Sequence, residues 1–169
     1  GAEYVLLTPG NYGSDFIRDG LGLDPALAVQ TSNFIGDALD LCGELGFRGA
    51  LLVGHVGKLV KLAGGMLNTH SRYGDCRMEL LAAHAAAAGL PPVRVAELLD
   101  CAACDDALRI LKEEGVCEET LARVTGRAAF HLGQRAGEEL EVGAVLFSKA
   151  YGLLSQTPQA GELLKHFRG

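Results

Sequence analysis

The chain has 169 residues, of which 49% are hydrophobic and 21% charged, as expected for one globular domain. Its formal net charge of −6 argues against nucleic acid or an anionic membrane as the main partner. No apolar run approaches the ~18 residues of a membrane-spanning helix, and the opening residues have no signal-peptide character, so we expect a cytoplasmic protein.

The first part of the chain alternates apolar runs with turn-rich loops. Tyr4–Thr8 (YVLLT) is a continuous apolar run, as in a strand buried on both faces. Pro9–Gly13 (PGNYG) is a loop rich in turn residues, and Ser14 or Asp15 is expected to cap a short helix after it. Ala28–Thr31 is predicted to be a brief second strand.

A helix is predicted next, over Asn33–Leu45. Ser32 is a good N-cap for it, and Gly46 is suited to end it. Its apolar residues recur at helical spacing, as in a stripe that faces a core, namely Phe34, Ala38, Leu41 and Leu45.

The middle and end of the chain continue this alternation. A third strand at Ala50–Val53 is followed by a short helix at Gly57–Ala63, which Gly64-Gly65 ends. Four more helices are predicted, the first capped by Asp75: Cys76–Ala88, Val93–Leu99, Asp105–Glu114 and Glu118–Ala136. The chain then offers a strand, a shorter strand and a closing helix that Thr157 caps: Leu140–Ser148, Gly152–Leu154 and a segment ending near Phe167.

Strands that alternate with helices indicate an α/β fold. We therefore predict a single Rossmann-like domain over residues 1–169, with a mainly parallel sheet and helices on both faces.

The cysteines carry no clear functional pattern. They are odd in number and lack framework spacing, which favours free thiols in a reducing cytosol: Cys42, Cys76, Cys101, Cys104 and Cys117. The single CxxC has no second pair or HxxxH nearby, so no protein metal site is predicted.

Ligands of open parallel sheets bind beyond the carboxyl ends of the strands, where three loops of this chain are expected to meet. These loops are residues 9–15, 31–36 and 54–61. In the first, Gly10 and Gly13 let the backbone approach a ligand such as a nucleotide-like cofactor closely. The open N–H groups of the helix start after Ser32-Asn33 could hold a carboxylate. For the first loop taken alone, a tight strand-to-helix turn is the favoured interpretation, and a helix cap without function explains Ser32-Asn33 equally well.

The segment from Gly49 to Glu79 holds the strongest functional signal, because polar groups gather beside a buried strand. Lys58 and Lys61 lie one turn apart near a helix N-terminus, which favours an anion site over a solvated helix face. His70 is the group best suited to move a proton near neutral pH, while Asp75 is a helix cap first and a catalytic group second. His84 and His131 lack companion motifs and are interpreted as structural.

Four stretches of the chain resemble one known family. They are PGNYGSDF, TSNFIGDAL, LLVGHVGKLVKLAGGMLNTHS and DCRMELLAAHAA, and they are similar to the C-terminal part of the CbiD family. This family comprises the cobalt-precorrin-5B C(1)-methyltransferases of anaerobic cobalamin synthesis. The resemblance runs from about Tyr4 to Leu154 and is weaker between Gly89 and Gly143. Members are about twice as long, so the chain resembles the C-terminal part of an enzyme whose N-terminal half is absent.

The resemblance implies methyl transfer from S-adenosyl-L-methionine to C-1 of a cobalt-precorrin, the cobalt belonging to the substrate. His70 or His55, with Asp75, would handle protons. The cofactor would be received by the loops that contain Gly10, Asn11, Gly13, Ser32, Asn33, Gly54 and Gly57. Substrate carboxylates and other polar groups would be held by Lys58, Lys61, Asn68, Thr69, Ser71, Arg72 and Arg77. The missing half would be a partner, and self-association is left open.

Two alternatives remain at this stage. The chain could be a non-catalytic half that grips the corrinoid while the missing half holds the cofactor. It could also be a nucleotide-dependent oxidoreductase domain on a Rossmann-like sheet, although no GxGxxG follows the first strand.

Overall fold

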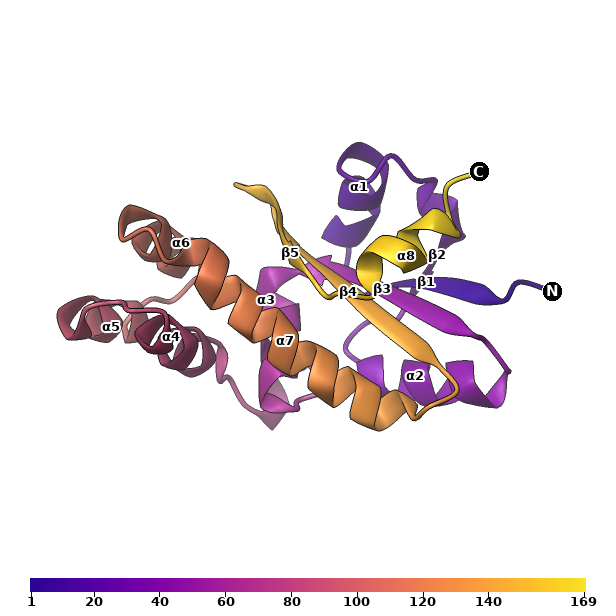
Figure 1. Ribbon diagram of the computed structural model, residues 1–169, viewed down its shortest axis with the longest axis horizontal. Helices are drawn as coiled ribbons and strands as arrows, with labels where there is room; N and C mark the ends of the chain where they lie inside the picture. The colour runs from indigo at the N-terminus through magenta and orange to yellow at the C-terminus, as the bar shows by residue number, and fades with distance from the viewer.

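The computed structural model describes residues 1–169, which form one five-stranded sheet with helices on both faces (Figure 1). The strands lie in the order β2-β1-β3-β4-β5. The first four are parallel, and β5 pairs antiparallel with β4. The strand bounds are β1 Tyr4–Thr8, β2 Ala28–Gln30, β3 Gly49–His55, β4 Glu141–Ser148 and β5 Gly152–Gln156. The prediction of an α/β fold with a mainly parallel sheet is confirmed.

The chain also forms eight α-helices and three short 3₁₀ segments, of which α8 follows the last strand and the others lie between strands. The helices are α1 Tyr12–Asp19, α2 Ile35–Glu44, α3 Val56–Leu59, α4 Arg77–Ala87, α5 Pro92–Leu99, α6 Cys104–Glu113, α7 Cys117–Ala136 and α8 Ala160–Lys165. The 3₁₀ segments are η1 Pro25–Leu27, η2 Val60–Gly64 and η3 Ser71–Tyr73. No helix is both long enough and apolar enough to cross a membrane.

The sheet separates two hydrophobic cores because successive strand residues point to opposite faces. In β1, Leu7 belongs to the larger core with α2, α4 and α7, whereas Leu6 belongs to the smaller core with α1 and α8. The central strand β3 is buried at six of its seven residues, as the apolar run in its sequence indicates. This burial fixes the positions from which the loops leave the sheet.

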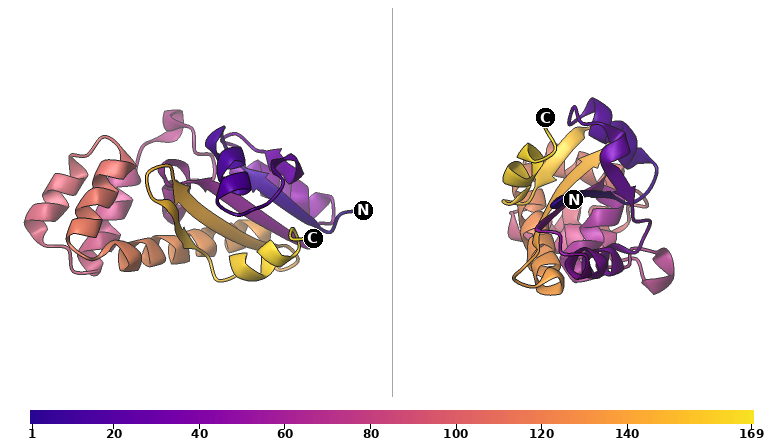
Figure 2. Two further views of the ribbon diagram at one scale, coloured as in Figure 1. Left: turned by 90° about the horizontal axis from the view of Figure 1, so that it is seen from above. Right: turned by 90° about the vertical axis from the view of Figure 1, so that its right-hand side faces the viewer.

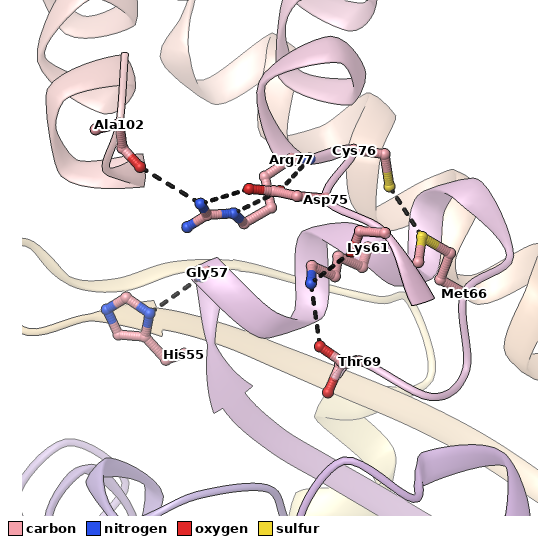
Figure 3. Close-up of polar contacts among 10 residues, drawn as sticks. His55, Gly57, Lys61, Met66, Thr69, Asp75, Cys76, Arg77 and Ala102 are labelled. Carbon is pink, nitrogen blue, oxygen red and sulfur yellow. Dashed lines mark hydrogen bonds and ion pairs between the residues drawn. The ribbon is translucent and has the colours of Figure 1, made fainter. Parts of the chain in front are cut away.

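Helices α4, α5 and α6 extend away from the sheet (Figures 1 and 2). Helices α4 and α6 pack against α7, and α5 packs against α4 and α6. This helical extension follows β3 and returns to β4 through the long helix α7. The chain just ahead of α6 lies beside the start of α4, because the guanidinium of Arg77 contacts the carbonyl of Ala102 (Figure 3).

The predicted helix caps are wrong in three places. Ser14 and Asp15 lie inside α1, because the helix already begins at Tyr12. Thr157 does not cap α8, because its hydroxyl accepts a hydrogen bond from the N–H of Ala144 in β4 (2.9 Å). Ser32 has a left-handed backbone (φ +51°) and lies ahead of a helix that begins only at Ile35.

The loop from residues 66 to 70 takes over the role expected of Ser32. The N–H of Gly36, in the first turn of α2, donates to the carbonyl of Leu67 (3.0 Å), and the N–H of Thr69 donates to the carbonyl of Asn33 (3.1 Å). Because the free N–H groups of a helix start need partners, a neighbouring loop can replace a side-chain cap. Asp75, in contrast, acts as a cap as expected, because its carboxylate accepts the N–H of Arg77 (3.2 Å), the first residue of α4. The helix begins at Arg77, one residue later than the predicted Cys76.

The apolar stripe predicted for the second helix does not face the core. The structure buries Ile35, Leu39 and Cys42, while Leu41 and Leu45 are exposed. Apolar residues occupy two adjacent faces of α2, so periodicity alone could not tell which face packs against the sheet.

Candidate functional site

The site lies where the order of the strands reverses. The chain passes from β1 to β2 on one side and then to β3 on the other side of β1. Ligands of open α/β sheets bind outside the carboxyl ends of the strands at such a point. Beside the loop that follows β3 is a cleft of about 380 Å³ with no hydrophobic lining residue. Its lining comprises Asn33, Gly57, Lys58, Lys61, Thr69, His70, Ser71, Asp75 and Arg77, all of which were candidates from the sequence.

Lys61 is a buried structural cation within this cleft. Its side chain is 5% exposed, and its ammonium donates to the carbonyl oxygens of Thr69 (3.1 Å) and Gly74 (3.2 Å) (Figure 3). These bonds tie the loop that follows η2 back to η2 itself. Lys61 therefore contributes positive charge to the cleft, but its donors are largely used by the backbone.

Lys58 is the cation with free hydrogen-bonding capacity. Its ammonium makes one long contact, to the side-chain oxygen of Asn33 (3.4 Å), which also accepts from the Thr69 hydroxyl (3.0 Å). Burial, and to a smaller extent the charge of Lys61, lower the pKa of Lys58. A side chain at Gly10 (φ +81°) would place its Cβ 3.3 Å from the Lys58 ammonium. The loop after β1 therefore reaches the cleft through Lys58.

Asp75 and Arg77 form a bidentate ion pair at the other end of the cleft. Both nitrogen–oxygen distances are 2.8 Å, and Arg77 also contacts the carbonyl of Ala102 ahead of α6 (3.4 Å; Figure 3). The hydrogen bonds from Arg77 lower the pKa of Asp75 to about 2, and the same pairing raises the pKa of Arg77. Asp75 is therefore ionised at neutral pH and already paired, which makes it a poor proton acceptor.

Both candidate histidines cap short helices. Nδ1 of His55 accepts from the N–H of Gly57 (3.0 Å), and Nδ1 of His70 accepts from the N–H of Arg72 (3.0 Å). Since Nδ1 is an acceptor in each case, the neutral rings carry their proton on Nε2. Each ring can thus offer an Nε2–H donor, whereas acting as a base through Nε2 would require the other tautomer and the loss of the cap.

The two histidines differ in their surroundings. His70 is exposed and lines the cleft. His55 lies on the other side of Gly57 from Lys61 and meets the Phe147 ring edge-on (5.8 Å between centroids; Figure 3). Burial lowers the pKa of His55, so its imidazole is neutral at pH 7.

The remaining candidates lie outside the cleft. Packing accounts for two glycines, because a Cβ at Gly13 would lie 1.7 Å from the Thr8 hydroxyl and one at Gly54 would lie 2.8 Å from Leu59. The side chain of Asn68 accepts the N–H of His70 (3.1 Å) and so shapes the loop. The side chains of the other three candidates are exposed to solvent, namely Asn11, Ser32 and Arg72.

A second hollow at the same edge of the sheet was missed from the sequence. It measures about 290 Å³ and lies between α1 and the turn from β4 to β5, where Lys149 lies 3.7 Å above the Tyr12 ring. Phe16 and Phe147 stack in its wall. The rule that marks the ends of β1 and β3 also marks Ser148-Lys149, at the end of β4.

The cysteines are five free thiols, and burial raises the pKa of each of them. No three His, Cys, Asp or Glu side chains gather as a metal site would require.

Comparison with known proteins identifies similar chains. A family model described as the C-terminal domain of CbiD matches residues 68–158, more than half of the chain. Three relatives share the name cobalt-precorrin-5B C(1)-methyltransferase. The protein of Ruminiclostridium cellulolyticum is 39% identical over 86% of this chain and 38% of its own length. The protein of Photorhabdus laumondii is 38% identical over 99% of this chain and 45% of its own length. The protein of Alkaliphilus metalliredigens is 33% identical over 95% of this chain and 42% of its own length.

The chain thus spans about two fifths of the length of these curated relatives. No solved structure matches it.

Proposed function

The chain belongs to the CbiD family, and from this premise we propose that it is the C-terminal part of an enzyme that methylates C-1 of a cobalt-precorrin. In this proposal, cobalt-precorrin-5B becomes cobalt-precorrin-6A in anaerobic cobalamin synthesis. The observation that carries the proposal is the wholly polar cleft at the reversal point of the sheet, where Lys58 is the cation with free donors.

The cleft suits the carboxylate-rich edge of such a substrate. Lys58 would bind a substrate carboxylate, while Lys61 would hold the loop in place and add positive potential. The exposed Ser71 hydroxyl and the Nε2–H of His70 would add hydrogen bonds. These groups would orient the ring rather than take part in bond making, because alignment of the two reactants is the main task of such an enzyme.

S-adenosyl-L-methionine would supply the methyl group, carried on a sulfonium centre. The loop after β1 has features that fit this donor. Gly10 has a positive φ and faces the Lys58 ammonium, Asn11 is exposed, and Tyr12 opens onto the hollow of about 290 Å³. The loop would hold the donor beside the cleft, with Lys58 between the two sites.

The test is calorimetry on the full-length protein that carries this chain. We expect Lys58→Ala to weaken the binding of cobalt-precorrin about tenfold or more, because a charge-assisted hydrogen bond is lost. Lys149→Ala is the matched control, since Lys149 lies outside the cleft and should leave this affinity unchanged. An unchanged affinity of the Lys58→Ala variant for cobalt-precorrin would refute the proposal that Lys58 binds a substrate carboxylate.

A second titration addresses the cofactor. S-adenosylhomocysteine should bind one-to-one, and Asn11→Ala should weaken that binding. If the full-length protein binds this product and Asn11→Ala binds it equally well, the cofactor site belongs to the other half. The chain would then be the non-catalytic corrinoid-binding half, an alternative that the engaged Nδ1 atoms of both histidines also favour. The name of the relatives gives no support to the oxidoreductase alternative.

A further inference from the structure

The outer face of α2 is an apolar stripe without a partner in this chain. Its large side chains are exposed, with values of 55% for Phe34, 52% for Leu41 and 65% for Leu45. The neighbouring face of the same helix is fully packed in the larger core, through Ile35, Leu39 and Cys42. In Figure 1, α2 lies at the lower edge of the molecule. Large exposed apolar side chains that share one helix face in this way indicate an interaction surface.

The stripe reaches the rim of the polar cleft. Phe34 directly follows Asn33, whose side-chain oxygen contacts Lys58, and Phe34 forms a bridge with Asn68 ahead of the cleft residue Thr69. A partner that covers the outer face of α2 would therefore also lie beside the cleft. The cleft itself has no hydrophobic lining, although the carbon framework of a corrinoid ring needs an apolar wall.

These relatives are more than twice as long as the part of them that matches this chain. The chain covers 38% to 45% of two of them, and the matched model is that of a C-terminal domain, so more than half of their length lies outside the match. We propose that this N-terminal half docks on the outer face of α2 and there supplies the apolar wall of the cleft. The proposal rests on the proposed function, in which the chain is part of a longer enzyme.

Thiol labelling of the full-length protein tests this docking. Leu45→Cys reports on the stripe, and Val93→Cys in α5 is the matched control, because Leu45 and Val93 are 65% and 67% exposed in this chain. Maleimide incorporation is followed by mass spectrometry of the peptides, which separates the new thiols from the native ones. We expect the Leu45→Cys thiol to react about tenfold more slowly than the Val93→Cys thiol, because the docked half covers it. Equal rates would overturn the proposal.

Two further measurements keep the outcome unambiguous. Leu41→Cys provides a second position on the stripe if Leu45→Cys fails to fold. Labelling rates are compared at concentrations where light scattering shows that the protein is a monomer. Protection of the Leu45→Cys thiol that disappears on dilution would mean that a second copy of the protein covers the outer face of α2, and this result would overturn the proposal. Methyl transfer is assayed separately in the unsubstituted protein. A protein without this activity but with a protected stripe would refute the proposed function and support the docking surface.

Discussion

The polar cleft and the outer face of α2 meet at Asn33-Phe34 but are built in opposite ways. In the cleft, Lys61, Asp75 and Arg77 already have partners within the chain, so much of its polarity holds the loops together. On α2, the large apolar residues of the stripe have no such partners. A polar residue beside a strand is thus no proof of a free ligand group, and an apolar stripe on a helix is no proof of a core in the same chain.

The largest expected effect tests the two faces of α2. Leu39→Ala removes a side chain that is 1% exposed in the larger core, and we expect a loss of about 3 kcal/mol in the free energy of unfolding. Leu39→Met should cost much less, because it conserves volume. Denaturant titration of the full-length protein measures both. A loss below about 1 kcal/mol for Leu39→Ala would mean that the inner face is not the packed one.

Lys61→Met tests whether the cleft is held together by its buried lysine. Methionine keeps the aliphatic stem but leaves the carbonyls of Thr69 and Gly74 without their donor. We expect the free energy of unfolding to fall by about 2 kcal/mol. Lys58→Met is the matched variant and should cost less than about 1 kcal/mol, because Lys58 makes one long contact. Equal losses in the two variants would contradict the distinction between a structural and a free lysine.

Thr69→Val probes the hydrogen bond that links the cleft to the start of α2. Thr69 is 4% exposed, and its hydroxyl donates to the side chain of Asn33 (3.0 Å). Valine has nearly the same shape but no donor, so we expect a loss of about 1 kcal/mol in thermal or denaturant unfolding. Thr69→Ser keeps the donor and should preserve the amide contact. A larger loss in Thr69→Ser than in Thr69→Val would show that the methyl group matters more.

The smallest effect concerns pH. The folded pKa of Asp75, about 2, lies below its ordinary value of 3.8. A carboxyl with a depressed pKa stabilises the fold above its unfolded pKa, and this stabilisation is lost as the pH falls from 3.8 towards 2. The carboxylate is half exposed, so solvent limits the effect to less than about 1 kcal/mol. In Asp75→Asn, unfolding curves recorded across this range should lose part of their pH dependence, and an unchanged dependence would assign it to other carboxylates.

Much of the fold could be predicted because the strands carry a strong signal. The apolar runs at the first and third strands place them in the sheet, and the residues that follow them mark its carboxyl edge. The true roles of Ser32 and Thr157 could not be predicted, because the decisive partners come from distant segments. The carbonyl of Leu67 accepts the N–H of Gly36 at the start of α2, and the N–H of Ala144 donates to the Thr157 hydroxyl. A cap signal in sequence considers only local partners.

Within the site, residue type and spacing identified the lining of the cleft but not how each group is used. Lys58 and Lys61 look equivalent one turn apart, yet burial and two carbonyls separate their roles. The hollow beside Tyr12 and Lys149 was missed because its walls come from α1 and the turn after β4, which lie far apart in the chain. Such pairings follow from strand order, which local patterns do not contain.

The order of the strands also has a consequence for how the molecule folds. The central pair joins Gly49 to Glu141 and His55 to Phe147, with the whole helical extension between the two strands. During synthesis, β3 therefore leaves the ribosome long before β4. The edge of β3 that pairs with β4 stays unpaired until β4 has been made. Closing such a long loop is entropically costly and slow, so we expect the docking of β4 to limit the folding rate. The helices of the extension lie closer together in the chain than β3 and β4 do, so the extension can form first and bring the end of α7 back to the open edge of β3.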